Sequence, residues 1–298
     1  MFYQKGVLLV LATAVISGLA IFLNQFAVQA FSSDIYTFLK NLVAGFLVAG
    51  VLLLMGEGQA VKGLSFKDWR VLTLIGLIGG SLPFILFFKG LSMSSAANGA
   101  LIHKLMFLFV AVLAVKFLKE RLDKKLLAGM LLLVIGQIMI FKFNFEVFLG
   151  AGDLLILAAT LLWAVESIMA KKALATISPR AVAAARLLCG CFFILLYLAW
   201  SGQLGLIGSL NLSQFSWVSL TGVLLTGYVL TWYAGLKYLN VSTAASLLTL
   251  GLPVTAALQW LQGQPLTSNQ GWGFLAIVLG CSLVLFSFKR RRAVYESV

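Results

Sequence analysis

The chain has 298 residues, of which 61% are hydrophobic and 10% charged, and its formal net charge at pH 7 is +13. Soluble globular proteins carry about 25% charged residues, so this composition excludes a soluble or disordered protein and indicates an integral membrane protein. The three cysteines (Cys189, Cys191 and Cys281) lie within apolar stretches, which excludes a disulfide framework.

Apolar stretches of about 20 residues, the length at which a helix crosses a bilayer, recur along the whole chain. In chain order they cover residues 5–30, 35–55, 70–91, 96–117, 125–143, 152–174, 180–200, 215–238, 242–262 and 270–288. The first stretch is too long for the apolar region of a secretory signal, so we count it as a membrane span. The sequence therefore predicts an all-α membrane protein of ten transmembrane helices, whose connections are too short to form a soluble domain.

The basic residues are distributed unevenly between the connecting loops. If the C-terminal run Lys289–Arg292 is cytoplasmic, ten crossings place the N-terminus in the cytoplasm as well. The cytoplasmic loops and termini then hold 17 of the 22 Lys and Arg residues, whereas the opposite loops hold two, Lys89 and Lys142. Such an asymmetry is the positive-inside signal. We therefore interpret the basic surplus as a topology signal rather than a nucleic-acid-binding surface, and we expect a multi-pass protein of a bacterial-type inner (plasma) membrane with both termini cytoplasmic.

The second half of the chain repeats the first. At an offset of 146 residues the segment Gly6–Ala12 aligns with Gly152–Ala158. Each half (1–146 and 147–298) holds five predicted spans, and because five is odd, the second half must enter the membrane in the opposite direction. Two inverted five-helix repeats around a central cavity are an architecture of secondary transporters. Further matches, at an offset of 144, include Ala100, Leu108, Val110, Gly129 and Gly136 over Ala244, Leu252, Val254, Gly273 and Gly280.

Several short motifs within this pattern are typical of one transporter superfamily. They are Gly152-Asp153-Leu154-Leu155 followed by Leu162-Trp163-Ala164, the basic residues Lys40 and Arg186 in the second and seventh spans, Gly90-Leu91 and Gly235-Leu236, Leu252-Pro253-Val254, and Leu118-Lys119-Glu120-Arg121-Leu122. Over nearly its whole length the chain resembles the drug/metabolite transporter superfamily, in its ten-helix EamA-like branch. The resemblance implies transport of a small metabolite, often export, through a cavity lined by the first, third, fourth, sixth, eighth and ninth spans. The chain departs from the pattern where Phe109 corresponds to Pro253 and where Gln264 corresponds to Glu120.

Two ionisable residues, Lys104 and His103, lie near the middle of the fourth predicted span. Such residues cost about 2.5–3.5 kcal/mol each on insertion scales and usually mark function. Lys104 and His103 correspond to Leu248 and Leu247 in the second half, so the fold accepts apolar residues at these positions in its other copy. Lys104 either binds an anionic substrate group, such as a carboxylate, or is neutralised by a fixed internal partner. His103 is either an interior histidine or a proton relay.

A carboxylate occurs within the sixth predicted span. Glu166 corresponds to Ala20 of the first half. Glu166 and Arg186 are equally far along the chain from the turn near Thr176, which places them at the same depth of a helical hairpin. Glu166 is therefore either one member of an ion pair with Arg186 or a carboxylate that couples transport to a proton.

Helix-breaking and aromatic residues supply the remaining candidates. Breaks at matching places in the two halves point to a transporter site, and we expect gating segments at Pro83 in the third span and at Gly251 and Pro253 in the ninth. Tyr228 and Trp232 share a helix face because they are four residues apart. The predicted substrate-binding residues are Lys104, His103, Trp163, Tyr228, Trp232, Asn24 and Asn98.

The predicted function is secondary transport, by alternating access, of a small polar or amphipathic metabolite such as an amino acid or related carboxylate, as an exporter or exchanger. The sequence contains no nucleotide-binding loop or catalytic motif, so we expect no enzyme activity, no cofactor and no metal. The expected partners are a small-molecule substrate and the lipid bilayer, with the proton as candidate coupling ion. One alternative is a membrane-embedded enzyme that acts on a lipid-linked substrate with Lys104, His103 and Glu166, against which the short loops argue. Another is a passive channel, against which the lack of a continuous polar stripe argues.

Overall fold

The computed structural model describes residues 2–27, 32–91, 93–94, 96–141, 150–208, 211–263 and 265–296. Within these ranges every regular element is helical. The α-helices are α1 (Phe2–Ala27), α2 (Ser33–Leu54), α3 (Gly58–Lys62), α4 (Phe66–Ile75), α5 (Leu82–Leu91), α6 (Ala96–Lys104), α7 (Met106–Leu118), α8 (Lys124–Phe141), α9 (Ala151–Ala173), α10 (Pro179–Trp200), α11 (Leu212–Tyr238), α12 (Val241–Leu247), α13 (Gly251–Leu261) and α14 (Ser268–Glu296). Shorter segments of other helix types are the π-helical η2 (Gly76–Ser81) and the 3₁₀-helical η4 (Leu204–Gly208) and η5 (Leu248–Leu250).

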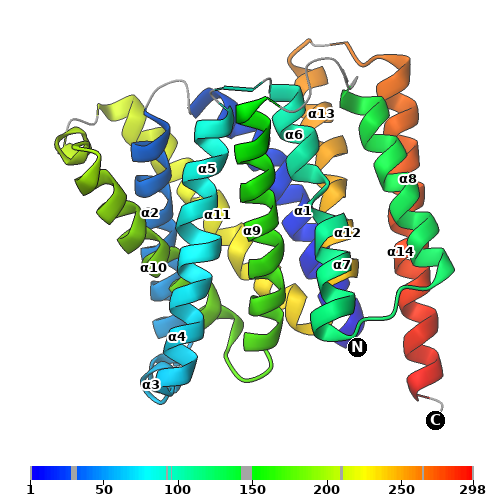
Figure 1. The fold of residues 1–298 in the computed structure, drawn as a ribbon, viewed down its shortest axis with the longest axis horizontal. Helices are drawn as coiled ribbons and strands as arrows, with labels where there is room; N and C mark the ends of the chain where they lie inside the picture. The colour runs from blue at the N-terminus through cyan, green and yellow to red at the C-terminus, as the bar shows by residue number, and fades with distance from the viewer. Residues whose placement is uncertain are drawn as a thin grey trace.

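Within the described residues, each of the ten predicted spans coincides with helix. Within the described residues, nine segments are long and apolar enough to cross a membrane. The remaining predicted span is the 18-residue helix α8, which packs along α14 at one side of the bundle (Figure 1). The prediction of an all-helical membrane protein is therefore confirmed.

Consecutive spans run in opposite directions, so the two termini lie at the same end of the bundle, the lower end in Figure 1. The first helix of the first half, α1, runs upward in this view, whereas the first helix of the second half, α9, runs downward. This arrangement is compatible with the ten-helix, inverted-repeat membrane fold.

Glycines bring α8 and α14 into close contact. A Cβ atom on Gly129 would lie 2.8 Å from the carbonyl oxygen of Gly280, and one on Gly136 would lie 2.6 Å from that of Gly273. Gly129 aligns with Gly273 in the repeat, and Gly136 with Gly280. The contact of Gly129 with Gly280 is therefore repeated by the contact of their equivalents, Gly273 and Gly136. Such crosswise pairs of contacts are typical of the interface of a two-fold symmetric dimer.

The third span changes helix type at its centre. The segments α4, η2 and α5 form one continuous span, Phe66–Leu91, and π-turns of this kind are frequent at functional sites. Pro83, in the first turn of α5, has no N–H to donate to the carbonyl group of Gly79, four residues earlier. That carbonyl group is left available to side chains of other helices. The expected irregularity at Pro83 is present as a change of helix type within a continuous span.

The fourth and ninth spans change helix type at equivalent positions. Helix α6 ends at Lys104 and α7 begins at Met106, and the corresponding residues of the second half form η5 (Leu248–Leu250). Gly251 and Pro253 lie in the first turn of α13, directly after η5, where proline is tolerated. A break therefore precedes the two predicted residues in the ninth span, and its counterpart in the fourth span contains no glycine or proline.

Candidate functional site

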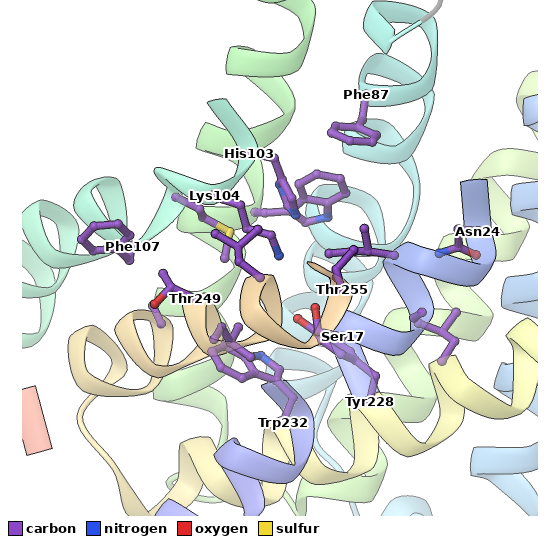
Figure 2. Close-up of a pocket in the computed structure, with 18 of the residues that line it drawn as sticks. Ser17, Asn24, Phe87, His103, Lys104, Phe107, Tyr228, Trp232, Thr249 and Thr255 are labelled. Atoms are coloured by element: carbon purple, nitrogen blue, oxygen red, sulfur yellow. The ribbon is translucent and has the colours of Figure 1, made fainter. Parts of the chain in front are cut away.

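A cavity of about 590 Å³ lies among the helices of both halves, within the range of about 300–1,000 Å³ that is typical of small-molecule sites. Helices of all six expected spans contribute to its lining: α1, α5, the α6–α7 pair, α9, α11 and the α12–α13 pair. Figure 2 shows side chains from these helices converging on a common space. Helices α2 and α10 add one charged residue each, Lys40 and Arg186.

Lys104 lies in the last turn of α6, immediately before the break in the fourth span, and lines the cavity. Figure 2 shows its side chain directed toward the middle of the labelled residues. Its ammonium group has no hydrogen bond or ion pair within the parts of the chain that are described. A fixed internal partner, one of the two predicted possibilities, is therefore not observed there.

His103 belongs to an aromatic cluster that forms one wall of the cavity. Its ring lies 4.9 Å from that of Trp163 and 5.3 Å from that of Phe87, measured between centroids. Phe84 packs edge-on against Trp163 at 5.2 Å. The His103 Nδ1 atom is buried and has no hydrogen-bond partner in the described structure, so a ligand could supply one.

The carbonyl oxygen of Gly79 anchors two side chains of the site. Trp163 donates its indole N–H to this oxygen at 3.0 Å, and Arg186 donates from Nη2 at 3.2 Å. Because Pro83 cannot donate an N–H to the same oxygen, both lone pairs serve these tertiary contacts. The hydrogen bond of the indole N–H group thus fixes the position of the Trp163 ring, and this ring is part of the cavity lining.

Glu166 and Arg186 are close together but are not directly paired. Their side chains both pack against Gly79, yet no ion pair joins them in the described part of the chain. Instead Glu166 Oε1 accepts a hydrogen bond of 2.5 Å from the hydroxyl group of Tyr233. The guanidinium carbon of Arg186 lies 6.0 Å from the centre of the Tyr233 ring. A direct ion pair, one of the two predicted alternatives, is therefore not observed in the described residues, where Tyr233 donates its hydroxyl group to the carboxylate.

The other predicted binding residues lie on different walls. Tyr228 and Trp232 line the cavity from α11, and Asn24 lines it from the last turn of α1. The Oδ1 atom of Asn24 accepts a hydrogen bond of 2.5 Å from the hydroxyl group of Tyr36. The side chain of Asn98 lies outside the described residues.

Lys40 is a charged lining residue that the site prediction omitted. Its side chain is 4% exposed, and its ammonium nitrogen lies 4.8 Å from the centre of the Tyr36 ring and 5.8 Å from those of Phe84 and Phe88. Cation–π contacts of this length stabilise a buried positive charge. The signal that could have located it is its own charge within a predicted span.

Comparison with known proteins identifies the family of this ten-span chain. The model of the EamA-like transporter family matches residues 4–142 and 150–286. The chain belongs to this family. Both matched segments are repeats of one family domain, and they fall on either side of the predicted boundary at residue 146.

The relatives of this EamA-like transporter carry transporter names. The chain is 25% identical to the uncharacterized transporter YyaM of Bacillus subtilis over 253 residues, which cover 79% of this chain and 80% of YyaM. It is 25% identical over 291 residues to an uncharacterized transporter of Archaeoglobus fulgidus, covering 95% and 99% of the two chains. A solved crystal structure with 20% sequence identity superposes with a TM-score of 0.79 and covers 96% of this chain and 98% of its own. That likeness supports the fold.

The described lining of this EamA-like transporter carries more positive than negative charge. Its charged residues are Lys40, Lys104, Arg186 and Glu166. Glu166 and Arg186 are neighbours, so their opposite charges offset each other. Lys40 and Lys104 remain as a surplus of two positive charges in a desolvated space, which favours an anionic ligand.

The two ends of the bundle differ. Cavity-lining residues such as Asn24 and Gln259 lie near helix ends opposite the termini. At the end that carries the termini, Glu120 accepts hydrogen bonds from the backbone N–H of Val241 at 2.8 Å and from the hydroxyl group of Ser242 at 2.7 Å. A carboxylate is favoured at the N-terminus of a helix such as α12. The loop after α7 is thereby fastened to α12 at that end.

The described residues contain no group of three or more His, Cys, Asp or Glu side chains that could hold a metal ion. The cavity lining contains ammonium, guanidinium, carboxylate, hydroxyl and aromatic groups. Groups of these kinds can bind and orient an organic anion.

Proposed function

We propose that this EamA-like transporter carries a small polar or amphipathic metabolite with an anionic group, such as an amino acid or related carboxylate, by alternating access, as an exporter or exchanger. The observation that carries the proposal is the ammonium group of Lys104, which lines a cavity of about 590 Å³ without a partner in the described structure. An anionic group of the substrate would bind this ammonium group, and its apolar part would lie against Trp163, Tyr228 and Trp232. His103 and Asn24 add hydrogen-bonding groups to the same lining.

The relation between the two halves supports the alternating-access part of the proposal. We infer that residues 1–146 and 147–298 are inverted repeats within one compact membrane domain. The opposite directions of α1 and α9 and the crosswise contact between α8 and α14 support this relation. Equivalent breaks between α6 and α7 and at η5 lie beside the cavity, so they would serve as its gating segments together with Pro83, Gly251 and Pro253.

Counterflow in proteoliposomes tests the proposed function. Vesicles that contain the purified protein are loaded with one unlabelled metabolite of a carboxylate and amino-acid panel, and uptake of the labelled metabolite is followed. We expect transient accumulation for at least one anionic member of the panel and none in protein-free vesicles. Accumulation without chemical change of the solute also distinguishes a transporter from a membrane-embedded enzyme. Failure of the whole panel would contradict the proposal.

The membrane orientation is tested with reporter fusions. We propose a plasma-membrane protein of bacterial type with cytoplasmic termini, because 17 of the 22 basic residues then face the cytoplasm. A reporter fused after residue 298 should score as cytoplasmic, and one inserted near residue 208 should score on the opposite side. If both reporters score on the same side, the span count or the orientation is wrong.

Proton coupling at Glu166 is a separate part of the proposal. Glu166 is 2% exposed, lines the cavity and has no direct cationic partner in the described residues, so it can alternate between proton-bound and free forms. Glu166→Gln should abolish the stimulation of uptake by a pH gradient while leaving exchange without a gradient measurable. Asp68→Asn, which removes a half-buried carboxylate outside the cavity lining, should leave the stimulation unchanged.

A double replacement separates coupling from structure at this position. In the double variant Glu166→Leu with Arg186→Leu, both buried charges are removed together, so stability should be largely retained. If that variant still responds to the pH gradient, Glu166 is not the coupling carboxylate.

A further inference from the structure

Lys40 and Lys104 are the two cations of the described cavity lining that no protein anion offsets. The positive charge of Arg186 is accompanied by Glu166, whereas neither lysine has a hydrogen bond or ion pair in the described structure. The rings around Lys40 stabilise its charge, but they provide no strong acceptor for its N–H groups. Both ammonium groups therefore keep their donors available to a ligand.

Lys40 and Lys104 line the cavity from different helices, α2 and α6, and Phe84 and Trp163 belong to the same lining. Phe84 contacts the Lys40 ammonium group at 5.8 Å and the Trp163 ring at 5.2 Å. Trp163 in turn contacts His103, the neighbour of Lys104, at 4.9 Å. Phe84 and Trp163 therefore form a continuous apolar part of the lining that starts beside the Lys40 ammonium group and reaches His103. A ligand with two anionic groups joined by an apolar part matches two ammonium groups on different helices and the aromatic rings of the same lining.

We propose that Lys40 and Lys104 bind the two carboxylates of a small dicarboxylate substrate, whose carbon chain lies along Phe84 and Trp163. This inference rests on the proposed transport function and narrows its substrate class. A dicarboxylate would neutralise the surplus of two positive charges. A monocarboxylate would leave one ammonium group desolvated and unpaired, which is unfavourable within a membrane protein.

The experiment compares acids with their mono-amides, which differ by one charge at nearly constant size. The probes are glutarate with its mono-amide and L-glutamate with L-glutamine, each measured as a substrate and as a competitor of counterflow. The diacids should have an apparent affinity about tenfold or more above that of the mono-amides. Inorganic phosphate, which carries its charge on one group, should compete poorly.

Replacing Lys40 tests which residue recognises the second carboxylate. Lys40→Met should lower the affinity for glutarate to that for its mono-amide and leave the affinity for the mono-amide nearly unchanged. Lys40→Arg, which keeps the charge, should retain part of the discrimination. Lys116→Met, which removes an exposed lysine of α7 outside the cavity lining, should behave as the unmodified protein. Thermal stability in detergent should not fall in Lys40→Met, because a buried charge is replaced by an apolar chain of similar length.

The outcomes separate this inference from the proposed function. Exchange of monocarboxylates without any preference for diacids, or equal competition by phosphate, would overturn the dicarboxylate assignment and leave the transport function intact. An equal loss for the diacid and the mono-amide in Lys40→Met, or a loss of stability with unchanged discrimination, would assign Lys40 a structural role and overturn the inference. If no carboxylate exchanges at all, the proposed function fails and the inference fails with it.

Discussion

Lys104→Leu should leave the protein folded and inserted but weaken substrate binding by about a hundredfold. The equivalent position of the second half is Leu248, which is helical and buried, so leucine is acceptable at this place in the fold. The ammonium group has no hydrogen bond or ion pair in the described residues. Its removal therefore leaves no buried partner without a hydrogen bond there. What is lost is one charge-assisted hydrogen bond to the substrate, which is among the stronger polar interactions in proteins.

The measurements are thermal stability in detergent and the further stabilisation that the counterflow substrate produces. Lys104→Arg should restore part of the binding, because a planar guanidinium group fits a site for a compact ammonium group poorly. Lys62→Leu, at an exposed position of α3 outside the cavity, serves as the control. Unchanged substrate-induced stabilisation in Lys104→Leu would remove Lys104 from the site, and marked destabilisation without substrate would show that it has a structural role.

Gly80→Ala should destabilise the protein strongly, by about 1–3 kcal/mol or more, as overpacking of a close contact does. A Cβ atom on Gly80 would overlap with the carbonyl oxygen of Arg186 and lie 3.1 Å from the Cα atom of Gly190. These are backbone atoms of α10, so no side chain can rotate to relieve the overlap. The helix itself would have to move away from η2, and it would take the Arg186 side chain with it.

Gly50→Ala is the matched control for this substitution. Gly50 also lies in a membrane helix, α2, but a Cβ atom there would have no neighbour within 4 Å. Alanine is the better helix former by about 1 kcal/mol, so the melting temperature should stay the same or rise slightly. Equal melting temperatures for the two variants would show that α10 and η2 do not pack as closely as the structure indicates.

The fold was predictable because hydropathy within a bilayer is a strong constraint. Within the described residues every apolar stretch of sufficient length is helical, since the backbone polar groups of a span must be paired internally. The positions of Lys104 and Glu166 in the cavity followed from the same constraint, because an ionisable group within a span is retained only where something compensates for it. The comparison with the other half strengthened both assignments, since their equivalents are Leu248 and Ala20.

The same comparison hid Lys40. Its equivalent is Arg186, another cation, so this position lacked the contrast between a charged and an apolar residue that marked Lys104 and Glu166. Only the structure shows that the two cations differ in their surroundings. Arg186 lies with Glu166 beside Gly79, whereas Lys40 is surrounded by aromatic rings.

Local irregularities and indirect contacts were the least predictable features. The break at Leu105 has no glycine or proline, and the one signal for it was its alignment with the segment just before Gly251 and Pro253. The contact of Glu166 with Tyr233 joins residues 67 positions apart. The spacing of Glu166 and Arg186 along the chain predicts that they lie at the same depth in the membrane. It does not predict that the side chain of Tyr233 contacts both of them.

In the proposed alternating-access cycle the two halves exchange conformations, and the crosswise contact between α8 and α14 keeps the same geometry before and after the exchange. Its free energy is then equal in the state open to one side of the membrane and in the state open to the other. It holds the halves together without biasing the equilibrium between these states. The contact of Glu120 with α12 is different, because its equivalent in the repeat is Gln264, an uncharged residue. Substitutions at the glycines of this contact between α8 and α14 should therefore change stability alone, whereas substitution of Glu120 should change the side of the membrane that the empty transporter faces at rest.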